Sequence, residues 1–138
     1  MVELVKPEDD EKERDKMLGI VENLMSDLGL SYRVIKLAAG DIAFPTAQTI
    51  DVETWIPSQG KYRETHSIST TTDFQARRLG IKYRDGDECE YVHILNGTAF
   101  AIGRTLIAVL ENNQQSNGSV IVPEVLRKYT GTDRIKKK

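Results

Sequence analysis

The chain has 138 residues, with 19 Lys and Arg against 21 Asp and Glu and a formal net charge of −2. The length suits one domain, and a composition of 39% hydrophobic and 29% charged residues is typical of a soluble globular protein. The charge balance excludes a global positive field that would draw the chain onto nucleic acid. The single cysteine excludes an internal disulfide. The sequence contains no run of about 18 apolar residues, the length needed to cross a membrane. We therefore expect one domain in a reducing compartment, which we take to be the cytoplasm, with no membrane partner.

Strand and helix patterns alternate along the first half of the chain. Residues 1–5 (MVELV) predict a short strand, and Pro7 followed by four acids predicts the start of a helix. Apolar residues then recur at three- and four-residue spacing until Gly29 ends the pattern. Residues 32–37 predict a second strand. Alternating residues on both sides of the turn at Pro57 predict one long hairpin over residues 48–70.

The second half contains shorter elements. Asp73 is expected to cap a short helix that Gly80 ends. Residues 81–84 and 89–95, joined by the turn Asp-Gly-Asp, predict a second hairpin in which Cys89 is packed. A final helix, marked by Leu106, Ile107, Val109 and Leu110, is expected to end around residues 117–118.

Together these patterns predict an α+β fold with an antiparallel sheet of about five or six strands, flanked by two main helices on one face. The other face would then be free to carry a site. The domain is expected to cover residues 1–131, and residues 132–138 are expected to form a disordered basic tail.

Glu64 lies in an unusually polar strand, YRETHS, followed by Ile68 and four hydroxyl residues. Unpaired polar groups cost about 1–3 kcal/mol each when buried, so this strand face is either wet or binds something polar. Strict alternation would put Glu64 and Ser67 on opposite faces of the sheet. Both can enter one pocket only if the strand bulges or ends near His66.

Arg104 is expected in the first turn of the last predicted helix, where the helix dipole is positive and a cation is disfavoured by about 0.3–1 kcal/mol. One interpretation is that the arginine and the helix N-terminus jointly hold an anion, most naturally a phosphate. The other is an ion pair with Glu90 or a neighbouring carboxylate. His66 and His93 are isolated histidines of the core or surface, which does not suggest a classical metal cage.

Several blocks of the sequence together resemble the seryl-tRNA synthetases, a family of class II aminoacyl-tRNA synthetases. LNGTAFAIGRTLIAVLENNQ followed by SVIVPEVLRKYTG is similar to motif 3 and the C-terminal end of that family. KYRETHSISTTTDFQARR is similar to its serine-pocket strand. The resemblance implies the class II catalytic core, of which this chain would hold a part.

The resemblance also implies roles for individual residues. Arg104 matches the motif 3 arginine that contacts ATP and its γ-phosphate, and Glu64 matches a carboxylate that binds ATP and helps to hold Mg²⁺, with Ser67 as the neighbouring ligand. Asn96 and Thr98 match residues that line the serine pocket. Glu3 matches the acid that receives the amino group of L-serine.

The function implied is ATP-dependent activation of serine to seryl-adenylate and transfer of the seryl group to tRNA(Ser). The family's tRNA-binding coiled coil, motif 1 and most of motif 2 have no counterpart in these residues. We therefore expect the C-terminal part of a catalytic domain, inactive by itself, with a free sheet edge that favours self-association, for example as a homodimer. The alternatives are a non-catalytic synthetase-like module that binds a nucleotide or a protein, and a structural remnant.

Overall fold

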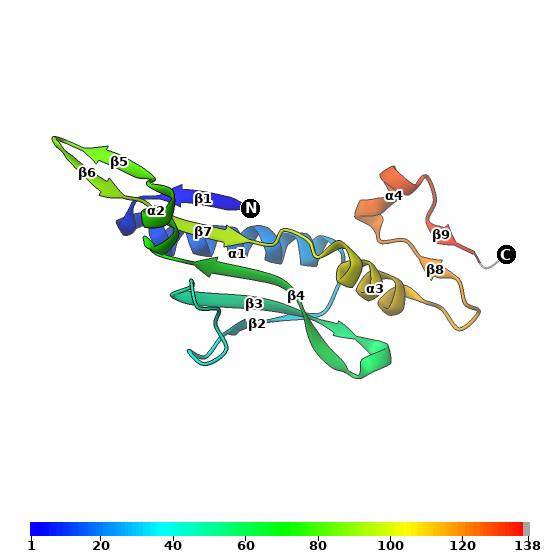
Figure 1. Ribbon diagram of the computed structural model, residues 1–138. Helices are drawn as coiled ribbons and strands as arrows, with labels where there is room; N and C mark the ends of the chain where they lie inside the picture. Colours follow the sequence, from blue (N-terminus) through cyan, green and yellow to red (C-terminus); the bar gives the residue numbers. More distant parts are fainter. Residues whose placement is uncertain (137–138) are drawn as a thin grey trace.

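A five-stranded antiparallel sheet forms the centre of the computed structural model, which describes residues 1–136 (Figure 1). The order of the strands across the sheet is β1-β7-β4-β3-β2. Their bounds are Val2–Val5 for β1, Tyr32–Lys36 for β2, Gln48–Ile56 for β3, Lys61–Thr70 for β4 and His93–Gly97 for β7. The predicted α+β class and the long hairpin are confirmed, because β3 and β4 pair along their whole length around a 3₁₀ turn at Pro57–Gln59.

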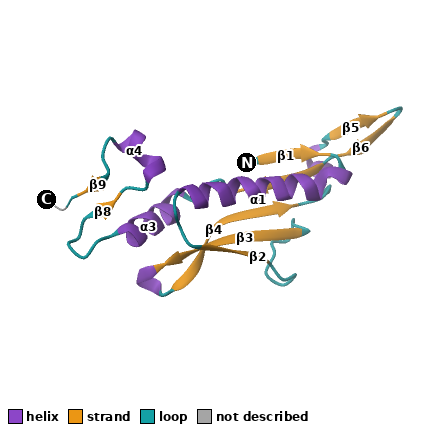
Figure 2. Cartoon of the chain, turned by 180° about the vertical axis from the view of Figure 1, so that it is seen from behind, coloured by secondary structure: helices purple, strands orange, loops and turns teal. Residues whose placement is uncertain are grey.

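Helix α1 (Asp10–Asp27) covers one face of this sheet, which we call the core face (Figure 2). Its apolar stripe of Met17, Val21 and Met25 is wholly buried and packs in one cluster with Ile68 of β4 and Leu95 of β7. Burying such side chains stabilises the fold by about 1.5–3 kcal/mol each. The residues that recur at three- and four-residue spacing in the sequence therefore form the face of the helix that contacts the sheet.

One carboxylate fixes the start of α1 to the sheet. Oδ2 of Asp10 accepts hydrogen bonds from the hydroxyl of Thr70, at 2.6 Å, and from Nδ1 of His93, at 2.7 Å. Thr70 and His93 belong to the adjacent strands β4 and β7, so this contact holds two strands and the helix in one arrangement.

The predicted second hairpin is wrong in one respect, because residues 89–95 do not form a single strand. Strands β5 (Lys82–Asp85) and β6 (Glu88–Tyr91) pair as a separate ribbon, and the chain then passes through Val92 into β7 of the central sheet. Figure 1 shows the ribbon projecting from one end of the molecule. Cys89 is exposed on it, contrary to the prediction that it is packed.

Two shorter helices flank the sheet. Helix α2 (Phe74–Leu79) begins after Asp73 and ends at Gly80, as predicted, but the carboxylate of Asp73 accepts a hydrogen bond from Arg77 and makes no capping bond. Helix α3 (Ile102–Asn113) buries Thr105, Ala108 and Val109. The other apolar residues that marked it in the sequence, Leu106, Ile107 and Leu110, are exposed.

The C-terminal residues contain structure that the sequence analysis did not predict. Helix α4 (Glu124–Thr130) follows α3, which is therefore not the last helix. Strands β8 (Val120–Ile121) and β9 (Arg134–Ile135) pair with each other. The expected disorder is thus wrong for Arg134 and Ile135, and the last two residues of the expected tail lie outside the described residues.

Within residues 1–136, none of the helices combines the length and the apolar character needed to cross a membrane.

Candidate functional site

A β-bulge in strand β4 shapes the candidate site. Val52 of β3 pairs with His66, but the next residue, Glu53, pairs with Glu64, which leaves Thr65 as an extra residue in β4. Because directly paired residues point to the same side of a sheet, Glu64 joins Glu53 while Ser67 joins Asp51. All four lie on the face opposite α1, which we call the open face. The sequence argument required β4 to bulge or to end near His66 for Glu64 and Ser67 to share a face, and the structure shows the bulge.

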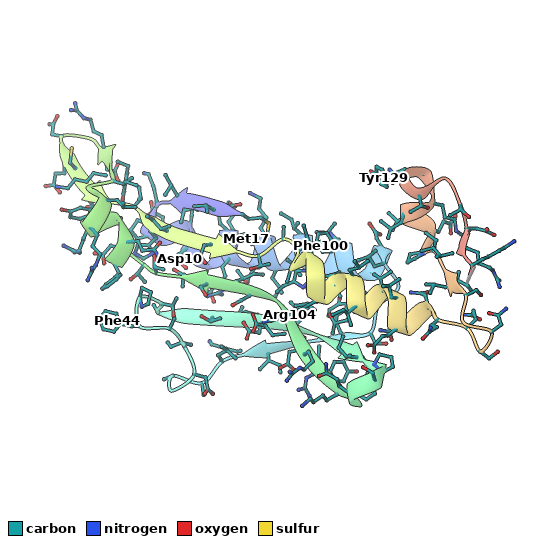
Figure 3. The ribbon with its side chains drawn as sticks, turned by 45° about the vertical axis from the view of Figure 1, so that its right-hand side comes forward. Asp10, Met17, Phe44, Phe100, Arg104 and Tyr129 are labelled. Atoms are coloured by element: carbon teal, nitrogen blue, oxygen red, sulfur yellow. The ribbon has the colours of Figure 1, made fainter. Side chains whose placement is uncertain are left out.

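Arg104 lies beside Glu64 at the mouth of a cleft. Its guanidinium donates a hydrogen bond to the backbone carbonyl of Glu64 at 2.9 Å, and the same Nη1 lies 3.4 Å from the Glu64 carboxylate. Figure 3 shows Arg104 at the beginning of α3, beside the β3–β4 hairpin. The cleft has a volume of about 380 Å³, and its lining comprises Glu53, Ile56, Gln59, Tyr62, Arg63, Glu64, Arg104 and Ile107.

The start of α3 favours an anion at this position. Ala101 occupies the N-cap and has no side-chain oxygen to accept hydrogen bonds from the first turn. The side chains of Arg104 and Glu64 are 58% and 48% exposed, so their ion pair contributes only about 0–1 kcal/mol and competes weakly with a ligand. Glu90, the other predicted partner of Arg104, instead accepts a hydrogen bond from the hydroxyl of Tyr83.

Asp51 is a site residue that the sequence analysis missed. Burial raises its pKa, the nearby charges of Glu64 and Glu53 raise it further, and a hydrogen bond from Ser67 opposes the rise. Its Oδ1 is buried and makes no hydrogen bond among the described residues. The signal was present in the sequence, because Asp51 and Glu53 alternate with apolar residues and must therefore lie on the same face as each other.

The predicted serine-pocket residues divide between the two faces of the sheet. Thr98 follows β7, and its amide donates to the carbonyl of Ser67 at 2.9 Å, so it lies next to Ser67. Asn96 pairs with Ser69 and lies on the open face. Glu3 of β1 pairs with Leu95, which points into the core beneath α1. Of the predicted site residues, Glu64 and Arg104 line the cleft. Ser67 and Asn96 lie on the open face and Thr98 lies beside Ser67, whereas Glu3 lies on the other face.

The described residues do not form a complete metal site. No group of three or more His, Cys, Asp and Glu side chains within residues 1–136 is arranged to hold a metal ion. The open face nevertheless presents oxygen ligands from Glu64, Ser67 and Asp51, which is the donor type that Mg²⁺ prefers. These residues could supply only part of a coordination shell, and a bound ligand would have to supply the rest.

Comparison with known proteins identifies the family to which this fold and cleft belong. The family model of the tRNA synthetase class II core domain (G, H, P, S and T) matches residues 2–113. The chain belongs to this class II synthetase family. Its fold is the antiparallel catalytic core of that family, as the solved structures below also show.

Several proteins similar to this chain are seryl-tRNA synthetases. The chain is 52% identical to the serine–tRNA ligase of Thermodesulfovibrio yellowstonii, over 99% of this chain and 32% of the relative. The crystal structure of seryl-tRNA synthetase from Pyrococcus horikoshii complexed with ATP superposes with a TM-score of 0.96 at 41% identity, over 99% of this chain and 31% of that one. The cytoplasmic serine–tRNA ligase of Naegleria fowleri, in complex with AMP, gives 0.91 at 40% identity, over 99% of this chain and 33% of that one. The chain thus spans about a third of the length of these relatives.

Proposed function

We propose that the chain binds ATP and serine as part of the catalytic core of a serine–tRNA ligase. The observation that carries the proposal is the position of Arg104, which lies at the uncapped start of α3 and beside the Glu64 carboxylate in one cleft. The similarity to serine–tRNA ligases supports the proposal, and two of the similar solved structures are complexes of those proteins with ATP and with AMP.

In the proposed complex Arg104 binds the terminal phosphate of ATP. A guanidinium presents several N–H donors in a fixed plane, and the first turn of α3 adds backbone N–H groups and a positive dipole end. The half-exposed pair with Glu64 is easily opened, so the arginine exchanges a carboxylate for a more highly charged phosphate at small cost.

The open face fits a magnesium ion that arrives with the nucleotide. Glu64 and Ser67 would hold it, as the family resemblance implies, and the unpartnered Oδ1 of Asp51 supports a cation on this face. A bound Mg²⁺ would neutralise phosphate charge. The protein's own contribution is to keep several carboxylates on one face, where burial raises the pKa of Asp51.

Asn96 and Thr98 are proposed to bind the serine, with Glu3 as the acid that receives its amino group. The position of Thr98 beside Ser67 supports a substrate site adjacent to the metal ligands. Glu3 lies on the core face, so this assignment requires β1 to be arranged differently when serine is bound.

In the reaction proposed for the whole ligase, the serine carboxylate attacks the α-phosphorus of ATP, pyrophosphate leaves, and the seryl group passes from the adenylate to tRNA(Ser). Such phosphoryl chemistry depends on positioning and on stabilisation of charge, and it needs no protein nucleophile. The tRNA, a cytoplasmic location and association into a homodimer through the free edge of β1 belong to the same proposal.

Calorimetric titration of the chain with Mg-ATP tests the binding site. We expect weak binding by the wild-type chain and none by Arg104→Ala. Arg78→Ala is the matched control, because it removes the same charge from an exposed position on α2. Equal affinities of the wild type and Arg104→Ala would show that the start of α3 is not the phosphate site.

Serine-dependent exchange between ATP and pyrophosphate tests the chemistry. We expect the 138 residues by themselves to show no useful exchange, and a protein with the length of the relatives to show it. Robust exchange by the 138 residues would refute the view that this part is inactive alone. ATP binding without serine-dependent exchange in the longer protein as well would favour a non-catalytic synthetase-like module.

A further inference from the structure

The β-bulge that forms the site is accompanied by a buried cluster of polar side chains. Thr54 of β3 and Thr65 and His66 of β4 are each at most 1% exposed, although they lie on the core face among apolar residues. The hydroxyls of Thr54 and Thr65 are 2.7 Å apart, and Nδ1 of His66 lies 2.9 Å from the Thr65 hydroxyl. Thr65, the extra residue of the bulge, is thus at the centre of the cluster.

The hydrogen bonds of the Thr65 hydroxyl can be assigned individually. It donates to the backbone carbonyl of Val52 at 3.1 Å. A hydroxyl has one proton to donate and can accept two, so the hydroxyl of Thr54 and Nδ1–H of His66 must both donate to it. The hydroxyl of Thr65 is therefore fully used, and the carbonyl of Val52 receives from it a hydrogen bond at the position where the strand pairing is interrupted.

The bulge determines which face Glu64 occupies. If the pairing of Val52 with His66 continued without an extra residue, Glu53 would face Thr65, and Glu64 would face Thr54. Glu64 would then point into the core, and of the two carboxylates that line the cleft only Glu53 would remain. A shift of one residue in register moves every following side chain to the other face of the sheet.

We propose that Thr65 is a positioning residue whose hydroxyl locks the bulge and so keeps Glu64 and Ser67 together on the open face. Thr65 itself is buried on the core face and is not part of the cleft lining. The inference rests on the proposed function for its consequence, the binding of Mg-ATP, but the effect on register can be measured without any nucleotide.

Cysteine pairs report the register directly. In a Cys89→Ala background, Glu53→Cys with Glu64→Cys places two cysteines opposite each other only if the bulge is present. Trp55→Cys with Arg63→Cys does so only in the slipped register. A disulfide needs Cα atoms about 4.4–6.8 Å apart, which directly opposed residues of an antiparallel pair satisfy. The rate of disulfide formation under mild oxidation then measures the fraction of each register.

Three variants separate the hydroxyl from its surroundings. Thr65→Val keeps the shape and removes the hydroxyl, and Thr65→Ser keeps the hydroxyl. Thr49→Val is the matched control, because the Thr49 and Ser69 hydroxyls form another buried cross-strand pair at 2.8 Å on the same two strands, away from the bulge. Mg-ATP affinity is measured for each variant without the added cysteines.

We expect Thr65→Val to slow the bulge-specific disulfide by about tenfold or more, because it removes a hydrogen-bond partner from each of three groups, the Thr54 hydroxyl, Nδ1 of His66 and the Val52 carbonyl. The slip-specific disulfide should appear in the same variant, and its affinity for Mg-ATP should fall by a similar factor. Thr65→Ser and Thr49→Val should retain the wild-type register and affinity.

An unchanged rate of the bulge-specific disulfide in Thr65→Val would overturn the proposal. If Thr65→Val shows no cooperative unfolding, Thr54→Val decides the question, since loss of one donor to Thr65 must still produce the slip-specific disulfide, and its absence would equally overturn the proposal. A wild-type chain that binds no Mg-ATP would refute the proposed function, whereas the disulfide rates would still decide the role of Thr65.

Discussion

Gly97 at the end of β7 is a position where adding a single methyl group should measurably lower the free energy of unfolding. A Cβ placed there would lie 2.8 Å from Cε of Met17, 3.2 Å from Cγ1 of Ile68 and 3.4 Å from Cε of Met1. Met17 and Ile68 are completely buried, so neither can turn into solvent to make room. Overpacking of this kind costs about 1–3 kcal/mol, and we expect Gly97→Ala to lower the free energy of unfolding by that amount.

Urea denaturation followed by circular dichroism measures this change. The midpoint should fall while the slope of the free energy against urea stays constant, because the surface exposed on unfolding hardly changes. Gly19→Ala in α1 is the control, since a Cβ there meets no atom within 4 Å and should stabilise the helix by about 0.5–1 kcal/mol.

A second substitution identifies the clash. Met17→Leu shortens the side chain that lies nearest to the new methyl group, and by itself it should cost less than about 1.5 kcal/mol. In the double variant the loss should be smaller than the sum of the two single losses by about 0.5–3 kcal/mol, because the residues are in contact. Strict additivity of the two changes would show that Met17 is not the residue that Gly97 makes room for.

Three further predictions concern charge and the C-terminal residues. Because the pKa of Asp51 is raised in the folded protein, its ionisation costs stability as the pH rises. Asp51→Asn should therefore be more stable than the wild type near pH 7 but not below about pH 3.9, and urea midpoints at the two pH values measure the difference. Burial lowers the pKa of His66, so the wild type should lose stability as the pH falls below about 6.5, and His66→Asn should show a flatter profile in the same measurement. Ending the chain at residue 131 removes the carbonyl of Asp133, which accepts from the amide of Val122 at 2.9 Å; hydrogen exchange of Val122 should accelerate while that of Val52 does not change.

The central sheet could be predicted because its strands carry one clear period. Residues 48–70 alternate on both sides of a Pro-Gly turn, and this pattern predicts both strands, although the bulge at Thr65 changes the face of the β4 residues on one side of it. The break at Val92 was missed, although the alternation of apolar and polar residues stops at the adjacent apolar pair Tyr91 and Val92, because such a pair does not by itself show that the chain passes from the ribbon to the central sheet. Only the tertiary contacts decide where one sheet ends and the next begins.

Helix α4 was missed although its signals were present. Pro123 precedes the helix and Gly131 ends it with positive φ, and Val125 and Leu126 pack against the main core. A helix this short has too few turns to show a period, so only its ends could have revealed it. The apolar residues of α3 predicted the helix but not its buried face, since three of the residues that marked it are exposed in the fold.

Two residues of the candidate site could be predicted because their side chains are unusual for their positions in the sequence. Arg104 in a positive first turn and Glu64 in a polar strand both conflict with local preference, and they meet in the cleft. The side on which Glu3 lies depends on its pairing with Leu95, a residue far away in the sequence, which no local pattern contains.

The same distant pairing has a consequence for how the protein is made. The backbone of Met1 donates to the carbonyl of Gly97, 96 residues further along the chain, and β1 pairs with β7 alone among the described strands. At a synthesis rate of about 5–20 residues per second, β1 leaves the ribosome about 5–20 s before its partner exists. Among the described residues no strand pairs with Val2 and Leu4 during that interval, so the exposed edge of β1 can engage other molecules. The pairing of β1 with β7 therefore forms late in synthesis. Conditions that slow translation of residues 6–92 should increase misassembly of the chain more than they alter the folded structure.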